Sequence, residues 1–391
     1  MIDFDFQVKT RIIFGKDKHL EIGKILKEYG AEDVMIFIGQ NSVKKSGLLD
    51  KVISCLKNEN IRYTVVEGVR ANPTADFARQ AVELAKALNP DFLLPIGGGS
   101  VIDTAKLVSV GYYYDGDCFD FNLHKEKPIK ALPIGSILTI SAAGSEMSTS
   151  CVIQDDKLMI KRGFNSELVR PLFAIENPEL TYSVNIEQTV NGIVDIMMHT
   201  LERYFQPSSG NEPADRFAEG LLKSVIKAGS VVVNNPNDYE SRAVLMLMSS
   251  LSHNGLTNIG KKFFMPVHQL EHALSGVYPK VAHGAGLSVL FPAWAKCYLE
   301  VEIDKFDTFA RNVFGLTNPD KLLNAKAGIE ELEKYFKSIH APLNFKELGL
   351  DNPDIDKLIS VLLDGGTKVI PHDKKPINQQ IARIIYESCR E

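Results

Sequence analysis

Residues 92–106 read FLLPIGGGSVIDTAK, a short apolar run followed by three glycines and the start of a helix-like stretch. The run Phe92–Ile96 has the composition of a buried strand, and a helix is expected to begin near Ser100. Glycine has no Cβ, so the backbone of this loop can approach a ligand closely. The first turn of the helix adds free N–H groups and the positive end of a dipole, which suits a pyrophosphate. The segment is therefore a candidate phosphate-binding loop.

A purely structural role is the alternative for the same loop. The sequence does not match G-x-G-x-x-G, so the usual dinucleotide fingerprint is absent. Ser100 and Asp103 have the S-x-x-D spacing of a capping box, so both side chains could serve only to start the helix. Three glycines could also form a simple tight turn.

The order of strand, loop and helix recurs through the first half of the chain. Apolar runs of strand character alternate with stretches whose apolar residues have helical spacing, and this repetition predicts a parallel sheet covered on both faces. The strand-like runs are Asp33–Ile38, Tyr63–Val66, Phe92–Ile96 and Leu172–Ile175, and the helical stretches are about Val43 to Asn58 and Ala75–Leu88.

The character of the sequence changes after Asn177-Pro178, where amphipathic helices follow one another. A chain of 391 residues is long enough for two domains. We expect a Rossmann-like α/β dinucleotide-binding domain over residues 1–184 and an all-helical domain over residues 185–391. The helices expected in the second part are Thr189–Phe205, Ala214–Val233, Ser241–Ser252, Gly284–Lys296, Lys321–His340 and Gln379–Cys389.

Composition argues against several partners. The 44 basic and 49 acidic residues give a net charge of -5, with no basic stripe for nucleic acid. No apolar run reaches the ~18–20 residues that a membrane span needs. The first residues, MIDFDFQVKT, lack the positive start and apolar core of a signal peptide. Five scattered cysteines without a C-x-x-C pair are typical of reduced thiols in a cytoplasmic protein.

A second cluster of residue types indicates a metal. Asp195 and His199 are four apart in VDIMMHTLERYF, a spacing that places both on one face of a helix. The neighbours of Asp195 are apolar, and a buried carboxylate needs a partner or a metal. His268 and His272 repeat the spacing, and His283 follows. Histidine with aspartate suits Zn²⁺ or Fe²⁺. Chance spacing with a solvated Asp195 is the alternative.

One competing motif overlaps these histidines. His268-Gln269-Leu270-Glu271-His272 matches H-x-x-E-H, the inverted zinc-peptidase pattern. In that hypothesis both histidines bind zinc and Glu271 activates water. The pattern has three fixed positions and leaves the glycine loop unexplained.

The loop after the first strand-like run bears on the choice of cofactor. In doubly wound folds an acid at this position binds the ribose 2′-hydroxyl of NAD. Here the loop is Gly39-Gln40-Asn41-Ser42, without an acid, and Lys44 and Lys45 are close by. The charges favour NADP(H) over NAD(H). The alternative is that both lysines are ordinary solvated helix residues.

Taken together and in order, these motifs make the chain resemble the iron-dependent (group III) alcohol dehydrogenase family, in its butanol dehydrogenase-like branch. The resemblance covers nearly the whole chain. Its residues are Glu67-Gly68-Val69 with Asn72-Pro73, GGGSVIDTAK at 97–106, Gly144-Ser145-Glu146, Asn191 to Asp195 with His199, His268 with His272, and His283-Gly284. Two positions depart from the family pattern: Ala143 stands where many relatives have Thr, and Ala282 where many have Pro.

The resemblance implies a dehydroquinate synthase-like subunit that binds one divalent metal, Fe²⁺ or Zn²⁺, and often dimerises through its N-terminal region. It implies four metal ligands, Asp195, His199, His268 and His283. It places His272 near the nicotinamide as a non-ligand, where a role in proton relay is expected. The cofactor contacts that it implies are Asn72, Gly98, Gly99, Ser100, Asp103, Thr139 and Lys161.

The expected activity is reversible hydride transfer between NAD(P)(H) and a short-chain primary alcohol or aldehyde. The metal would act as a Lewis acid on the substrate oxygen. A catalytically silent protein that retains the fold is the remaining alternative.

Overall fold

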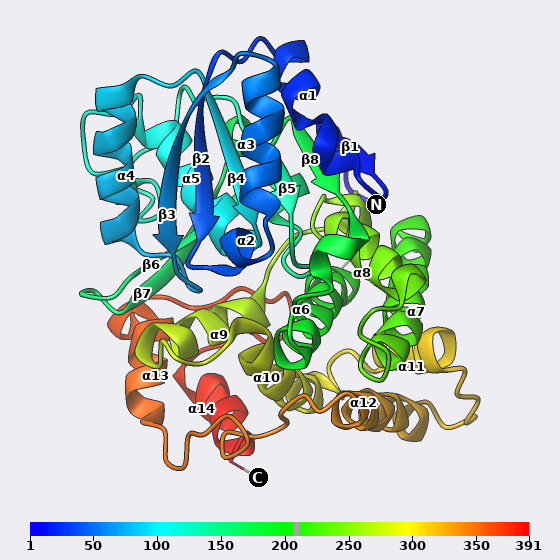
Figure 1. Ribbon diagram of the computed structural model, residues 1–391. Coiled ribbons are helices and arrows are strands. Elements are labelled where there is room, and N and C mark those ends of the chain that lie inside the picture. The colour runs from blue at the N-terminus through cyan, green and yellow to red at the C-terminus, as the bar shows by residue number, and fades with distance from the viewer. Residues whose placement is uncertain (207–210, 391) are drawn as a thin grey trace. The chain divides into compact units, whose positions relative to one another are not determined.

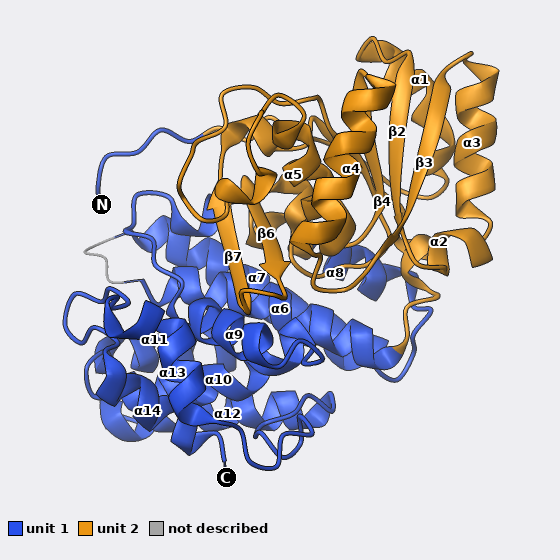
Figure 2. Cartoon of the chain, turned by 90° about the vertical axis from the view of Figure 1, so that its left-hand side faces the viewer, with its two compact units in different colours: residues 1–6, 186–248, 255–391 blue, residues 7–185, 249–254 orange. Residues whose placement is uncertain are grey.

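The computed structural model describes residues 1–206 and 211–390, and the chain divides into two compact units (Figure 2). The α/β unit contains residues 7–185 and 249–254. The helical unit contains residues 1–6, 186–248 and 255–391, apart from the positions not described. The boundary expected between residues 184 and 185 stays a prediction, and the structure adds that two short segments group with the unit remote from them in sequence.

A six-stranded sheet, parallel at every pairing, forms the centre of the α/β unit (Figure 1). This confirms the parallel sheet predicted from the alternation of strands and helices. In spatial order the strands are β1 (Arg11–Phe14), β8 (Phe173–Glu176), β5 (Gly135–Leu138), β4 (Phe92–Gly97), β2 (Asp33–Gly39) and β3 (Arg62–Val69).

Helices cover both faces of this sheet because its strands are apolar on both sides. In β2, Val34 and Ile36 pack into one hydrophobic cluster with α1 (Ile22–Glu28) and α3 (Leu48–Asn58). Met35 and Phe37, which alternate with them, pack into a second cluster with α4 (Ala75–Leu88) and α5 (Gly99–Gly111). Alternate residues of a strand point to opposite faces, so the continuous apolar run of β2 supplies two cores.

Several elements of the α/β unit differ from the sequence prediction. The single helix expected from Val43 to Asn58 is two helices, α2 (Ser42–Lys45) and α3, because Gly47 adopts a positive φ of 72° between them. Strands β1 and β5 and the antiparallel hairpin of β6 (Ser150–Asp155) and β7 (Ile160–Asn165) were not predicted. Short 3₁₀ turns complete the unit: η1 Lys18–Glu21, η2 Cys118–Asp120, η3 Ser145–Met147, η4 Glu167–Val169 and η5 Pro178–Thr181.

The second part of the chain is helical, as predicted. Its elements are α6 (Ile186–Tyr204), α7 (Glu212–Val232), α8 (Tyr239–Ser252), η6 (Leu256–Asn258), α9 (Pro266–Val277), α10 (His283–Tyr298), α11 (Ile303–Phe314), α12 (Lys321–Ser338), α13 (Ile355–Leu362), η7 (Asp364–Gly366) and α14 (Gln379–Ser388). Helices α11 and α13 were not predicted, and α9 was implied only by the spacing of two histidines. Among the described helices, none is long and apolar enough to cross a bilayer.

Helix α6 is the centre of the helical unit. It packs against α7 and α10, and α10 packs in turn against α9. Nearly every residue of α6 from Thr189 to Tyr204 is buried. A helix buried on all sides is expected to be apolar all round, so the polar side chains that it carries stand out.

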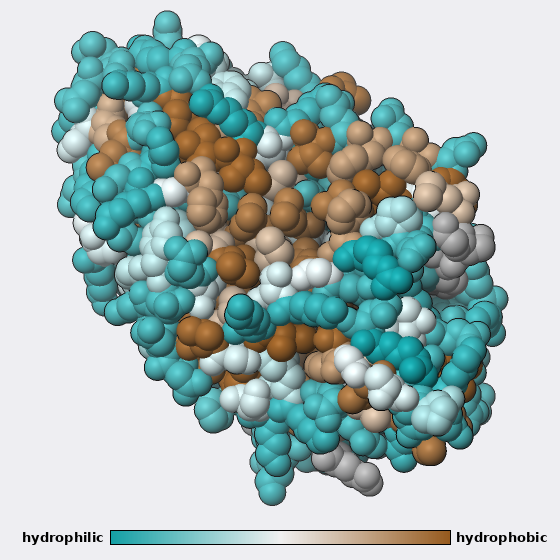
Figure 3. All heavy atoms as spheres, turned by 90° about the vertical axis from the view of Figure 1, so that its right-hand side faces the viewer, coloured by the Kyte–Doolittle hydropathy of each residue, from teal (hydrophilic) through white to brown (hydrophobic). Residues whose placement is uncertain are grey.

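Apolar side chains are also grouped on part of the surface (Figure 3). The exposed large apolar residues of the helical unit include Ile2, Phe4 and Phe6 at the N-terminus. In the α/β unit they include Phe14, at the end of the edge strand β1. Ile2, Phe4 and Phe6 follow one another at alternate positions, and exposed apolar residues that lie together are typical of interaction surfaces.

Candidate metal centre and cofactor site

Three polar side chains of α6 form one buried stripe. Asp195, His199 and Glu202 are spaced i, i+4 and i+7, so they lie on one face of the helix. They are 5%, 4% and 1% exposed. The His199 Nε2 lies 3.4 Å from the Asp195 Oδ1. The sequence prediction that Asp195 and His199 share a buried helix face is therefore what the structure shows.

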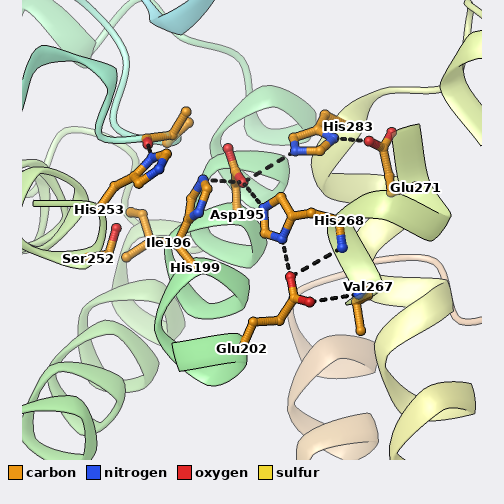
Figure 4. Close-up of polar contacts among 12 residues, drawn as sticks. Asp195, Ile196, His199, Glu202, Ser252, His253, Val267, His268, Glu271 and His283 are labelled. Carbon is orange, nitrogen blue, oxygen red and sulfur yellow. Dashed lines mark hydrogen bonds and ion pairs between the residues drawn. The ribbon is translucent and has the colours of Figure 1, made fainter. Parts of the chain in front are cut away.

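Two histidines from other helices point at the same carboxylate oxygen (Figure 4). His268 of α9 places its Nε2 3.8 Å from Asp195 Oδ1. His283, the first residue of α10, places its Nε2 3.7 Å from it. Three imidazole nitrogens therefore surround one carboxylate oxygen. This is the quartet that the resemblance implied.

The quartet fits a metal ion on two counts. Among the described residues, the buried Asp195 Oδ1 and His268 Nε2 have no hydrogen-bond partner. An unsatisfied buried polar atom costs about 1–3 kcal/mol, so such atoms need another partner. Tetrahedral ligands at 2.0–2.1 Å from a zinc ion are ~3.4 Å apart. The separations of 3.4, 3.8 and 3.7 Å between the histidine nitrogens and the carboxylate oxygen are close to that spacing.

Glycines let α10 bring His283 to this point. A Cβ on Gly284 would lie 2.1 Å from the backbone oxygen of Asn191 in α6. A Cβ on Gly286 would lie 3.0 Å from the Cγ of Glu271 in α9. Neither glycine has a positive φ, so the close approach of the helices is what requires Gly284 and favours Gly286. The Gly284 that follows His283 is thus part of how the site is built.

Two buried carboxylates contact the histidines on the side away from Asp195 (Figure 4). Glu202 was not named from the sequence, and Glu271 was named only as the water-activating group of the peptidase hypothesis. Glu202 accepts a hydrogen bond from His268 Nδ1, and Glu271 accepts one from His283 Nδ1. A sequence signal was available, because His199-Thr-Leu-Glu202 and His268-Gln-Leu-Glu271 repeat the pattern H-x-L-E. In each copy the glutamate lies one turn after a histidine.

Burial and the nearby carboxylates have opposite effects on the pKa of His268. Burial lowers the pKa of the imidazole, but Glu202 and Asp195 raise it more, to about 9. Without a metal, the His268 ring therefore carries protons on both nitrogens near neutral pH. A metal ion that binds its Nε2 must displace the proton there.

His272 lies beside the quartet and outside it. It is half-buried, and its ring centroid is 5.6 Å from that of His283 and 6.3 Å from that of His268. The H-x-x-E-H hypothesis needs Glu271 as the group that activates water. In the structure Glu271 accepts hydrogen bonds from His283 and from the hydroxyl of Ser275 instead. These contacts give the peptidase hypothesis no support.

The two loops predicted to bind the cofactor meet at one edge of the sheet. Strand β2 pairs with β4, with Ile38 opposite Ile96, so Gly39 to Ser42 and Gly97 to Ser100 follow adjacent strand ends. The chain passes from β2 outward to β3 and returns on the other side of β2 as β4. Such a switch point is where doubly wound sheets bind ligands. The exposed side chains of Gln40, Asn41 and Ser42 lie there.

The start of α5 does not have the capping box that the sequence allowed. Its N-cap is Gly98, without a side-chain cap hydrogen bond, so Ser100 does not cap the helix and that alternative is wrong. A Cβ on Gly98 would lie 2.2 Å from Ile140, and one on Gly99 3.3 Å from Ala143. The backbone N–H of Thr139 donates to the oxygen of Gly97 at 3.1 Å. Close approach of two loops explains Gly98 and Gly99, whereas a Cβ on Gly97 would meet Val101 of α5 itself.

The other implied cofactor residues have different settings. The Asp103 carboxylate is tied into the protein, since it accepts hydrogen bonds from the Ser145 hydroxyl at 2.5 Å and the Val152 N–H at 2.8 Å. Asn72 has a positive φ of 53° between β3 and α4, and Lys161 is half-buried on β7. Whether they contact the cofactor stays a prediction.

One serine hydroxyl contacts two buried glutamates just after the loop that carries Ala143 and Gly144. The hydroxyl of Ser250 lies 2.6 Å from Glu146 Oε1 and 2.7 Å from Glu176 Oε1. One hydroxyl hydrogen cannot serve two carboxylates, so one of the two acids must keep its own proton. Burial accordingly raises the pKa of both, that of Glu176 to about 8.

Comparison with known proteins identifies the family. The model of the iron-containing alcohol dehydrogenases matches residues 9–178, and that of the C-terminal part of the same family matches residues 189–388. The chain belongs to the iron-containing alcohol dehydrogenase family. The resemblance inferred from the motifs is thereby confirmed.

Among its relatives in this family, NADH-dependent butanol dehydrogenase A of Clostridium acetobutylicum is 38% identical over 371 residues, which cover 94% of this chain and 95% of that protein. NADPH-dependent aldehyde reductase YqhD of Escherichia coli is 31% identical over the full length of both chains. The crystal structure of NADH-dependent butanol dehydrogenase A from Thermotoga maritima superposes with a TM-score of 0.95 at 34% identity, covering 100% of this chain and 99% of that one. Nothing in these comparisons supports a peptidase or a silent scaffold.

Replacing Gly284 with alanine tests how the dehydrogenase builds this site. The new methyl group overlaps Asn191, so we expect a loss of about 1–3 kcal/mol in stability and weaker metal binding, measured by thermal unfolding and by metal content. Gly220 in α7 is the matched control, since a Cβ there meets nothing within 4 Å. Gly220→Ala should be neutral or gain about 0.5–1 kcal/mol. Equal behaviour of the two variants would contradict the close approach.

Proposed function

We propose that this protein is a metal-dependent alcohol dehydrogenase or aldehyde reductase that transfers hydride reversibly between a nicotinamide dinucleotide and a short-chain primary alcohol or aldehyde. The observation that carries the proposal is the convergence of three histidine nitrogens on one buried carboxylate oxygen. Membership of the iron-containing family supports it. The relatives named butanol dehydrogenase and aldehyde reductase support the substrate class.

Asp195, His199, His268 and His283 are proposed to hold one divalent metal, Fe²⁺ or Zn²⁺. When bound, such an ion supplies a Lewis acid that stabilises an alkoxide and polarises a carbonyl. Taken with its four ligands alone, three neutral imidazoles and one carboxylate, a divalent ion keeps one net positive charge, which favours an anionic substrate oxygen. His272, half-buried beside His283, is proposed to relay a proton.

The cofactor is proposed to bind at the ends of β2 and β4. The uncapped N-terminus of α5, with Gly98, Gly99 and Ser100, would receive the pyrophosphate. Gly39 to Ser42 would receive the adenosine ribose. The remaining proposed cofactor contacts are Asn72, Thr139 and Lys161. Asp103 is proposed to act indirectly, through its hydrogen bonds to Ser145 and Val152.

The preference for NADP(H) over NAD(H) is proposed from the neutral loop Gly39–Ser42 and the nearby lysines. The structure also places a carboxylate near this loop, which the sequence did not reveal. Glu67 of β3, the strand beside β2, forms an ion pair with Lys44. Lysine would attract a 2′-phosphate and the carboxylate would repel it. The names of the relatives include both NADH-dependent and NADPH-dependent enzymes.

We further propose a cytoplasmic homodimer without nucleic-acid or membrane partners. The net charge of -5 supports the absence of a nucleic-acid partner, and the five free thiols support the cytoplasmic location. The exposed Ile2, Phe4 and Phe6 are proposed to lie in the dimer interface. Light scattering that gives the mass of one chain at micromolar concentration would contradict the dimer.

Removing a proposed ligand tests the mechanism. His268→Ala should lose bound metal and reduce the rate of butanal reduction by roughly 100-fold or more, since a metal contributes several kcal/mol to the transition state. His340→Ala, at an exposed position outside the quartet, is the control and should keep the metal content and activity of the wild type, even if its φ of 64° makes alanine less stable there. A metal-free His268→Ala protein that retains full activity would refute the proposal.

The ratio of kcat/KM with NADPH to that with NADH tests the cofactor choice. We expect a ratio above one for the wild type. Glu67→Gln should raise it and Lys44→Met should lower it, each by up to about 5-fold, since an exposed ion pair contributes up to ~1 kcal/mol. A clear preference for NADH that neither substitution changes would overturn the interpretation of this loop.

A further inference from the structure

Behind two of the histidines of the quartet lies a buried carboxylate on the opposite ring nitrogen. Glu202 contacts Nδ1 of His268, and Glu271 contacts Nδ1 of His283 (Figure 4). The side chains of both glutamates are fully buried, at 0% exposure. Burying a carboxylate away from water costs several kcal/mol unless hydrogen bonds or opposite charges compensate it. We therefore expect both glutamates to have a specific role.

Glu202 has three hydrogen bonds to satisfy it. Besides His268 Nδ1, it accepts from the backbone N–H groups of Val267 at 2.6 Å and of His268 at 3.2 Å. Those N–H groups lie in the first turn of α9, where free donors and the helix dipole favour an anion. Glu202 of α6 thus fixes both the start of α9 and the ring of the histidine that α9 carries.

Glu271 holds the ring of a histidine in the same way, one helix further along. It comes from α9, accepts from His283 Nδ1 at the start of α10, and its other oxygen accepts from the Ser275 hydroxyl. Helix α6 therefore orients a histidine of α9, and α9 orients a histidine of α10. The two pairs are equivalent in chemistry, and both glutamates follow a histidine by three residues.

An acceptor at Nδ1 decides what the other ring nitrogen can do. A neutral imidazole carries one N–H. If that hydrogen is donated from Nδ1 to a carboxylate, Nε2 keeps its lone pair and faces the Asp195 oxygen. The carboxylate also makes the ring a stronger electron donor and holds its plane.

The charges around the quartet indicate which ion charge fits the site. Asp195, Glu202 and Glu271 bring three negative charges, and the buried Arg203, whose guanidinium donates to the backbone oxygen of His199 at 2.6 Å, brings one positive charge. With neutral imidazoles the group has a net charge of -2. A divalent cation balances it, whereas a trivalent cation leaves an excess charge in a buried place.

We propose, on the basis of the function proposed above, that Glu202 and Glu271 are positioning residues that fix the Nδ1–H form of His268 and His283, set the affinity of the quartet, and match it to a divalent ion. They do not touch the metal or the substrate.

The experiment measures metal affinity directly, without turnover. Metal-free wild type, Glu202→Gln and Glu271→Gln are titrated with Zn²⁺ against a chromophoric chelator, and with Co²⁺, whose visible absorption reports its coordination. Loss of a carboxylate behind a ligand typically weakens metal binding by about 10–100-fold. We expect that loss in both variants, together with a changed Co²⁺ spectrum.

Glu219→Gln is the matched control. Glu219 is also a buried glutamate of the helical unit, but it accepts a hydrogen bond from Tyr204 and lies outside the quartet and its carboxylates. This variant should bind Zn²⁺ like the wild type, even if its thermal stability falls. Glu202→Gln also disturbs two backbone contacts at the start of α9 and could misfold for that reason. Glu271→Gln is the second variant that keeps the test decisive, since Glu271 accepts from the side chains of His283 and Ser275.

The outcomes separate this proposal from the proposed function. If His268→Ala loses the metal while Glu202→Gln and Glu271→Gln bind Zn²⁺ as tightly as the wild type, the positioning role is overturned and the quartet stands. If His268→Ala binds Zn²⁺ normally, the quartet itself is wrong. A weakening in Glu219→Gln equal to that in the other two would reduce the effect to general destabilisation and overturn the positioning role.

Discussion

The carboxylate of Asp195 sits in the middle of a helix that is buried on all sides, and the rest of the helical unit is arranged around that constraint. Its immediate neighbours, Val194 and Ile196, are fully buried apolar residues. An anion in such a place requires positive partners. The structure provides three imidazole nitrogens within 3.8 Å of one oxygen, and yet that oxygen has no hydrogen bond among the described residues. Such an arrangement fits the metal ion proposed to bind there.

The same constraint explains features that lie further from the metal. Helix α10 must begin against α6 and α9 for His283 to reach the site, and this accounts for Gly284 and Gly286. The start of α9 is held by Glu202, a residue of α6. Contacts between helices therefore fix the positions of the proposed ligand histidines. A preorganised site is expected to be built on rigid elements in this way.

Sequence alone predicted the parts of this protein that follow local rules. Asp195 and His199 could be paired from helical spacing, and the parallel sheet from repeated strand, loop and helix. That the loops after β2 and β4 meet at one edge was not predicted, because it depends on the order of the strands in the sheet. What could not be predicted depends on partners remote in sequence. Spacing could not separate His268 from His272, because the choice depends on where α9 faces α6. Glu67 comes from a neighbouring strand, and the break at Gly47 replaces one helix by two. The repeated H-x-L-E pattern was visible but had no meaning until the fold showed which histidine each glutamate serves.

Anomalous diffraction from crystals of the protein loaded with Zn²⁺ or Fe²⁺ tests the central claim most directly. We predict one strong peak per chain, about 2.0–2.2 Å from the Asp195 oxygen and from Nε2 of His199, His268 and His283. A peak bound instead by Glu271, His272 and His283, the other group of ligand-type side chains that lie together here, or no peak at this place at all, would contradict it.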